Sequence, residues 1–165
     1  MKNYLKLSLV ALVLLITNVS VFAQETTIWV KVLEEIPQDV DEESIYSYIQ
    51  LSDNQGNVSL NTQASIQAFT TEVSSNGRVK WKNAKGNGQN RIKFENILPK
   101  DTEERDFLQY QVKAEEGFER VARVKTSIEP GEEEEYNIWI SIKIRSETKW
   151  TPLDFPIDPV MKYHP

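Results

Sequence analysis

The sequence predicts an all-β protein: an antiparallel β-sandwich of seven or eight strands, followed by an extended, proline-rich C-terminal tail. Three observations lead to this prediction. Apolar and polar residues alternate in several short segments, which is the period of a half-buried strand. Gly, Asn, Asp and Pro recur between these segments, as they do in turns. Helical periodicity, which crossover connections between parallel strands require, is scarce.

The first 23 residues have the pattern of a secretory signal peptide. Two lysines precede the apolar stretch Leu7–Ile16, and Val21 and Ala23 suit the positions before a cleavage site. The apolar stretch is shorter than the roughly 20 residues that a membrane span needs. We therefore expect cleavage after Ala23, a mature chain 24–165 without a membrane span, and a periplasmic or extracellular location.

The first expected strands lie at the start of the predicted sandwich domain, 24–145. Ile28, Val30 and Val32 share one face of the first strand. A second strand is expected from Ile45 to Leu51, followed by the turn residues Asp53–Asn57. A weaker strand is expected over Ile66–Val73. The Asn-Gly dipeptide that follows it is the strongest short signal for a β-hairpin.

Two similar segments, 78–83 and 91–96, form the clearest feature of the sequence. Each has apolar residues at its second and fourth positions and charged residues between them. We interpret them as adjacent antiparallel strands of one hairpin. Their apolar residues are expected to face the core: Val79, Trp81, Ile92 and Phe94.

The second half of the domain is expected to contain strands near 108–112, 118–128 and 136–144. The last has the longest alternation, from Tyr136 to Ile144, so we expect it in the centre of its sheet. The pattern stops at the tail, 146–165, which has three prolines between 152 and 159. Because proline removes a backbone donor and restricts its neighbour, we expect no regular strand or helix there, only a tail packed on the domain.

Several short motifs follow one another between residues 76 and 144, in an order that is found in a known family. They are the Asn76-Gly77 turn, the strand end Phe94-Glu95-Asn96-Ile97-Leu98-Pro99, the segment Tyr110–Ala114 and the pair Gly117-Phe118. This series resembles carboxypeptidase regulatory-like domains and the related collagen-adhesin B-type repeats. The resemblance implies a transthyretin-like or immunoglobulin-like sandwich. It implies no particular function, because such sandwiches carry many.

Basic residues give the first candidate binding surface. Five of them are expected on one face of the hairpin: Arg78, Lys80, Lys82, Arg91 and Lys93. They would form a positive patch on a chain whose net charge is −6. Such a patch suits an acidic protein surface, an anionic envelope polymer or a glycan. The alternative is a solvated sheet face whose charges discourage edge pairing. Overall acidity and export argue against nucleic acid as the partner.

Aromatic residues give the second candidate surface. Trp29, Tyr46, Tyr48 and Trp139 fall on the polar side of their expected strands. On adjacent strands they would form an exposed aromatic surface that stacks on sugars. Alternatively, both sheet faces are partly buried and the tail covers one of them, since its own apolar residues also need cover.

The side-chain inventory limits the chemistry of the protein. There is no cysteine and only one histidine, His164, so the sequence argues against a thiol nucleophile, a histidine-based triad and a multi-histidine metal site. We expect no catalysis, no cofactor and no metal. The sequence predicts an exported, non-catalytic interaction module of the bacterial cell envelope that binds a protein. The alternative is a carbohydrate-binding module that uses exposed Trp and Tyr.

Overall fold

A computed structural model describes eight ranges of the chain: 24–34, 36–37, 39–84, 91–100, 107–108, 113–114, 119–143 and 151–164. The expected signal peptide lies outside these residues, as do Tyr110, Val112, Phe118 and Ile144 of the expected strands. The side chain of Arg91 also lies outside the description, although its backbone is part of a strand.

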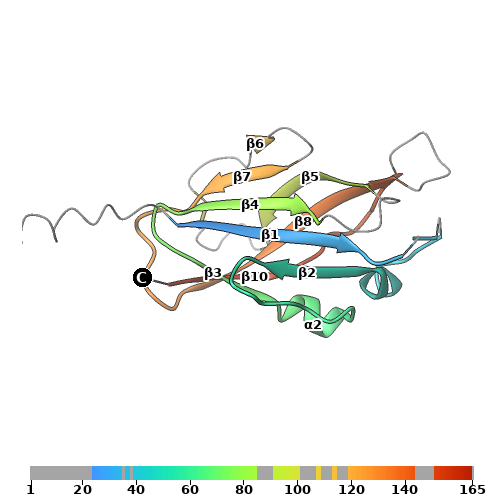
Figure 1. The fold of residues 1–165 in the computed structure, drawn as a ribbon, viewed down its shortest axis with the longest axis horizontal. Helices are drawn as coiled ribbons and strands as arrows, with labels where there is room; N and C mark the ends of the chain where they lie inside the picture. Colours follow the sequence, from blue (N-terminus) through green and yellow to red (C-terminus); the bar gives the residue numbers. More distant parts are fainter. Residues whose placement is uncertain are drawn as a thin grey trace, which may run out of the picture.

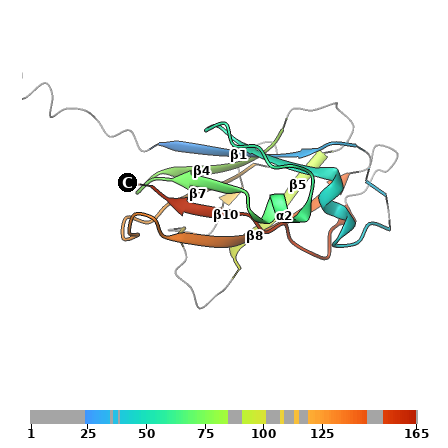
Figure 2. The same ribbon diagram turned by 90° about the horizontal axis from the view of Figure 1, so that it is seen from below.

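The described chain is all-β, as the sequence predicts, and its strands form two sheets that face each other (Figures 1 and 2). The first sheet has the order β2-β1-β4-β7-β6, and the second has the order β3-β10-β8-β5, with β9 beside β8. The strands are β1 (Glu25–Val32), β2 (Ile49–Asp53), β3 (Thr70–Val73), β4 (Arg78–Asn83), β5 (Arg91–Pro99), β6 (Lys113–Ala114), β7 (Arg120–Arg123), β8 (Glu133–Lys143), β9 (Thr151–Pro152) and β10 (Val160–Tyr163). Two short helices, the 3-10 helix η1 (Ser44–Tyr48) and α2 (Gln63–Gln67), accompany them.

Each sheet contains one parallel pair, which the prediction of a purely antiparallel sandwich did not include. β1 pairs with β4 in parallel, and β10 pairs with β3 in parallel. The other pairings between named strands are antiparallel. The chain changes sheets between β3 and β4, and β4 then lies beside β1 and runs in the same direction.

The hairpin expected from 78–83 and 91–96 is wrong. β4 lies between β1 and β7 in the first sheet, whereas β5 pairs with β8 in the second. The four apolar residues of the two segments are nevertheless buried, with at most 1% exposed. Alternation decides which face of a strand is buried but not which strand lies beside it, and these two strands face the same core from opposite layers.

The Asn76-Gly77 turn, expected to close a hairpin, instead connects the two sheets. Asn76 has a φ of 56°, a left-handed conformation that Asn tolerates better than most residues. A Cβ atom at Gly77 would lie 2.7 Å from the carbonyl oxygen of Ser74, so glycine is needed for the close approach of the backbone. The expected turn is therefore present, but β3 and β4 are not paired with each other.

Two of the expected strands begin with helical residues. Residues 45–48 belong to η1 and residues 66–67 to α2, so only Ile49–Asp53 and Thr70–Val73 are strands. Local capping favours the helices: the Asp41 carboxylate accepts hydrogen bonds from Ser44 N and Oγ, and the Thr62 hydroxyl accepts one from Ser65 N. Such side-chain contacts compete with the strand ladder.

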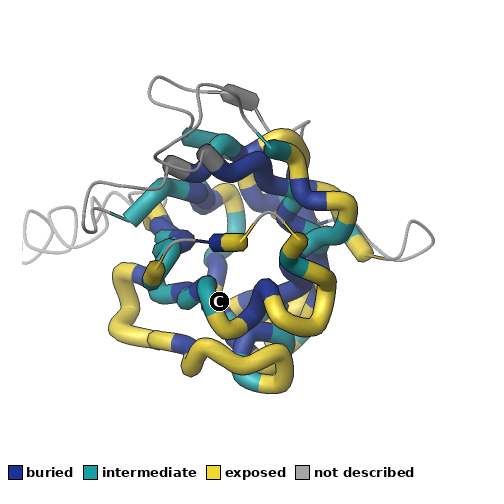
Figure 3. Tube along the Cα trace, turned by 90° about the vertical axis from the view of Figure 1, so that its right-hand side faces the viewer, coloured by how far each residue is buried: buried dark blue, intermediate teal, exposed yellow. Residues whose placement is uncertain are grey.

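β8 is the central strand of its sheet, as its long alternation predicts. It pairs with β5 along one edge and with β9 and β10 along the other. Its inward residues have 2% exposure or less: Tyr136, Ile138, Ile140 and Ile142. Trp81 of β4 meets Tyr136 across the core, with ring centres 6.0 Å apart at 66°, and its indole N–H donates to the Tyr136 hydroxyl at 3.4 Å. In Figure 3, buried stretches alternate with exposed connections.

The expectation that the tail forms no regular strand is wrong for Val160–Tyr163. This segment is β10, which lies between β3 and β8. Before it, Ile157 exchanges backbone hydrogen bonds with Ile138 of β8 at 2.7 and 2.9 Å. Ile157 and Met161 are fully buried. Pro152, Pro156 and Pro159 all precede β10, and the four residues of β10 keep their backbone donors.

The Asp53–Asn57 turn is present and ties the two sheets together. One carboxylate oxygen of Asp53 accepts the backbone N–H groups of Gln55 and Asn57, both at 3.0 Å. The other accepts the Thr71 hydroxyl of β3 at 3.1 Å. Asp53 is 5% exposed, and buried carboxylates require partners of this kind. The turn chemistry read from the sequence therefore also joins β2 to the second sheet.

Candidate interaction surface

The outward residues of β4 are the three basic ones of the predicted patch, Arg78, Lys80 and Lys82, because Val79 and Trp81 are fully buried. Neighbouring strands extend the patch. Arg123 of β7 lies opposite Arg78, and Trp29 of β1 lies opposite Lys82. We call the outward face of β1, β4 and β7 the basic face. Its charged residues are Lys31, Arg78, Lys80, Lys82, Arg123, Glu25 and Glu119.

Arg91 and Lys93, expected in the same patch, belong to the second sheet. The sequence prediction places them in the patch because it pairs 78–83 with 91–96 in a hairpin, and this hairpin does not form. The predicted patch did not include Lys31 and Arg123, which lie on the basic face. Arg123 could have been found only by knowing that β7 pairs with β4, because it lies 45 positions after Arg78.

The described ion pairs leave the basic face with an excess of positive charge. Glu25 lies 3.6 Å from both Arg78 and Lys80, and Glu119 lies 3.2 Å from Lys82. Among the described residues, two carboxylates therefore lie on this face beside five cationic side chains. Because these pairs are partly exposed, each contributes little to stability. The net result is a positive surface on a chain that is acidic overall.

Arg78 and Arg123 are directly opposite each other on neighbouring strands. Like charges in this arrangement are destabilising. Asn76 partly offsets the cost, since its side-chain oxygen accepts a hydrogen bond from Arg123 at 3.0 Å. A sheet face selected for stability alone would favour opposite charges at this pair. The Glu25 carboxylate, 3.6 Å from Arg78 on the same face, supplies one such opposite charge.

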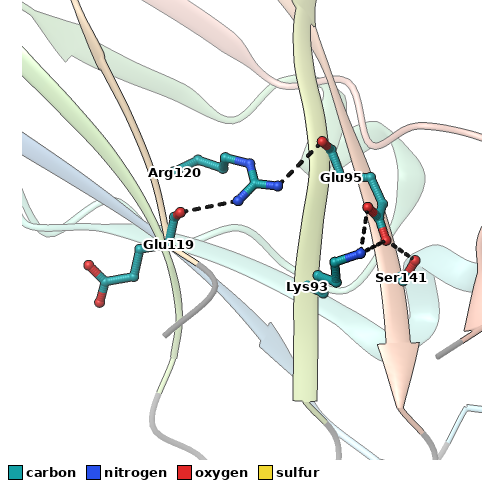
Figure 4. A network of polar contacts seen from close by, with 5 residues as sticks. All are labelled: Lys93, Glu95, Glu119, Arg120 and Ser141. Atoms are coloured by element: carbon teal, nitrogen blue, oxygen red, sulfur yellow. Dashed lines mark hydrogen bonds and ion pairs between the residues drawn. The ribbon is translucent and has the colours of Figure 1, made fainter. Parts of the chain in front are cut away.

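Lys93 is held within its own sheet. Its ammonium contacts the Glu95 carboxylate at 2.8 Å, and the same carboxylate accepts the Ser141 hydroxyl at 2.6 Å (Figure 4). β5 has a bulge between Phe94 and Asn96, which places Glu95 beside both partners. Partial burial would raise the pKa of Glu95, but the hydrogen bonds from Lys93 and Ser141 outweigh it and lower that pKa.

The Glu95 contacts predict a pH-dependent contribution to stability. Because the pKa of Glu95 is lowered on folding, its contribution is present above the unfolded value and is lost as pH falls through the folded value. We expect Glu95→Gln to lower the free energy of unfolding by less than about 1 kcal/mol at neutral pH, since the pair is partly exposed. Urea unfolding at pH 7 and near pH 3 checks this. A difference that persists undiminished at pH 3 would contradict the assignment.

The four residues of the predicted aromatic surface do not come together. Trp29 lies on the outward face of the first sheet, whereas Trp139 lies on the outward face of the second. Tyr46 is buried at 2% exposure, and Tyr48 packs partly against the core. The reason is η1, which turns Tyr46 inward where a strand would have kept it outside. Trp81 is fully buried, as expected of a core residue.

A polar cluster around Asp158 joins the tail to three other segments. Asp158 accepts hydrogen bonds from the Tyr46 hydroxyl and the Gln67 amide, both at 3.2 Å, and from the Lys100 ammonium at 3.1 Å. Burial and the nearby Asp158 raise the pKa of Tyr46. Lys100 also contacts Glu135 at 2.7 Å. These residues are far apart in the sequence and share no motif. The cluster therefore could not be predicted from the sequence. Its contacts stabilise the tail.

No group of three or more His, Cys, Asp or Glu side chains in the described ranges has the arrangement to hold a metal ion. In the same ranges, no helix has the length and apolar character to cross a membrane.

Comparisons with known proteins bear on the fold. No protein-family model matches the chain, and no curated protein matches it. Among solved structures, the crystal structure of the inclusion body protein PixA from Burkholderia cenocepacia is similar, with a TM-score of 0.52 and 12% sequence identity. The match covers 89% of this chain and 98% of that one. At this identity the similarity concerns the fold alone.

Proposed function

We propose that the protein is an exported, non-catalytic interaction module of the bacterial cell envelope, and that its basic face binds an acidic surface of a protein partner. The observation that carries the proposal is the excess of cationic side chains on this one face of an acidic chain. A positive face attracts and orients an acidic partner. Trp29, partly buried beside Lys82, adds the kind of aromatic contact that interfaces favour.

The sheet edges support a partner that docks on a face. Glu72 of edge strand β3 bonds through both backbone groups to the Gln55 side chain, at 2.6 and 3.1 Å. Edge strand β2 is covered by the segment that follows it, since Ser59 N donates to Leu51 O at 2.9 Å. Edge strand β5 has its bulge, where Arg120 reaches the Glu95 carbonyl oxygen at 3.5 Å (Figure 4). Blocked edges disfavour strand addition.

Capture from a cell-envelope extract tests the proposal. Residues 24–165 are immobilised beside a variant with Arg78→Glu and Arg123→Glu, and retained proteins are identified by mass spectrometry. We expect the wild type to retain an acidic protein that the variant loses. We also expect that protein to elute near 1 M salt, where screening acts over only about 3 Å.

A matched control changes the same number of charges on the other sheet. Lys93→Glu with Lys162→Glu reverses two cations of the second sheet and produces the same net charge as the first variant. We expect this control to retain the partner. Loss of the partner from both variants would show that overall charge, not the basic face, governs binding and would overturn the proposal.

A further inference from the structure

We propose that the acidic surface recognised by the basic face is carried by a second copy of this chain. The inference deepens the proposed function and rests on it, because it names the partner of the same face. The second sheet carries a group of negatively charged side chains on its outward side. We call the outward acidic residues of β3 and β8, together with the adjoining turn, the acidic face: Glu72, Glu129, Glu132, Glu133 and Glu135.

Two lysines among the described residues lie near the acidic face. Lys162 lies between β3 and β8, 2.8 Å from Glu133, and Lys100 pairs with Glu135. Glu133 and Glu135 remain more than half exposed, at 53% and 56%. In the described part of the chain, the acidic face therefore carries five carboxylates beside two lysines, and the basic face carries five cations beside two carboxylates.

Apolar contacts are available beside the charges on both faces. Trp29 lies within the basic face. Trp139 follows Glu133 and Glu135 along the outward side of β8, and Leu98 on neighbouring β5 is 46% exposed. Opposite charges around a partly apolar centre are the pattern of a specific interface.

The two faces lie on opposite layers of the same molecule (Figure 2). Contact between the basic face of one copy and the acidic face of the next is therefore heterologous. Such a contact leaves one face unused at each end, so it continues into a chain or closes into a ring. The expected assembly grows with concentration and does not stop at a twofold dimer.

Sedimentation velocity over a range of concentrations tests the inference. At about 0.01 M salt, where the Debye length is about 30 Å, we expect the sedimentation coefficient of residues 24–165 to rise with concentration. At about 1 M salt we expect the monomer. Because the chain is acidic overall, general charge repulsion predicts the opposite trend with salt. A monomer at every concentration in low salt would overturn the inference.

Complementary charge reversal identifies the faces involved. Arg78→Glu with Arg123→Glu makes both faces acidic, and Glu133→Lys with Glu135→Lys makes both faces basic. Each variant alone is expected to stay monomeric, and an equimolar mixture of the two is expected to associate again. Circular dichroism and urea unfolding confirm that each variant folds. Association of either variant alone, or none in the mixture, would overturn the assignment of the faces.

The outcomes separate this inference from the proposed function. If the wild type stays monomeric but retains a different acidic protein that Arg78→Glu with Arg123→Glu loses, the basic face binds a foreign partner and only the self-association fails. If the wild type associates and no extract protein depends on the basic face, the second copy is the partner.

Discussion

Replacing Trp81 with alanine is expected to lower the free energy of unfolding by about 3–5 kcal/mol, the usual cost of deleting a large buried aromatic side chain. Trp81 is fully buried on β4 and packs edge-on against Tyr136 of β8. Its removal leaves a cavity between the sheets and takes the indole donor away from the buried Tyr136 hydroxyl. Urea unfolding followed by far-UV circular dichroism measures the effect.

Trp29→Ala is the matched control for this variant. Trp29 is on neighbouring β1, opposite Lys82, and is only partly buried. We expect a loss of about 1 kcal/mol or less, because substitutions away from the core have small effects. Equal losses from the two variants would show that the first sheet does not bury one face and expose the other.

Ending the chain after Pro159 is expected to abolish cooperative unfolding. The deletion removes β10, the strand between β3 and β8. It exposes the inward faces of both neighbours and removes fully buried Met161. β3 would lose its partner within the sheet, and a four-residue strand cannot persist alone. Far-UV circular dichroism during a thermal scan reports the outcome.

Lys162→Ala is the control for the truncation, since it keeps β10 and removes only a partly exposed ion pair with Glu133. We expect its midpoint of unfolding to stay close to that of the wild type. A truncated chain that still unfolds cooperatively near the wild-type midpoint would mean that β10 is an accessory segment and not part of the sheet.

Alternation predicted much of the fold because it reports burial directly. The core residues of β1, β4, β5 and β8 were identified correctly, as was the central place of β8. Alternation does not show which strands are neighbours in a sheet. Nothing in the local pattern distinguishes β4 beside β5 from β4 beside β1 and β7, because strand pairing depends on contacts between segments far apart in the chain.

Side-chain capping and proline explain the other differences. The alternation from Ile45 to Tyr48 suits a strand, but the Asp41–Ser44 contacts start a helix there. In the tail, three prolines led us to expect no strand, but β10 begins directly after Pro159. Three of the five residues of the predicted basic patch remain together, and two separate with β5. The candidate surface was therefore predicted in its chemistry but not in its full composition.

The basic face exists only if β4 presents its basic residues beside β1 and β7, on a sheet separate from β5. Because the chain has no cysteine, engineered pairs can test it directly. We expect Thr27→Cys with Lys80→Cys to form a disulfide, since these positions are partners on β1 and β4 and adjacent strands bring Cα atoms within bonding range. Lys80→Cys with Lys93→Cys, opposite each other only in a hairpin of β4 and β5, should stay reduced under the same mild oxidation. A disulfide in the second pair and none in the first would contradict the account.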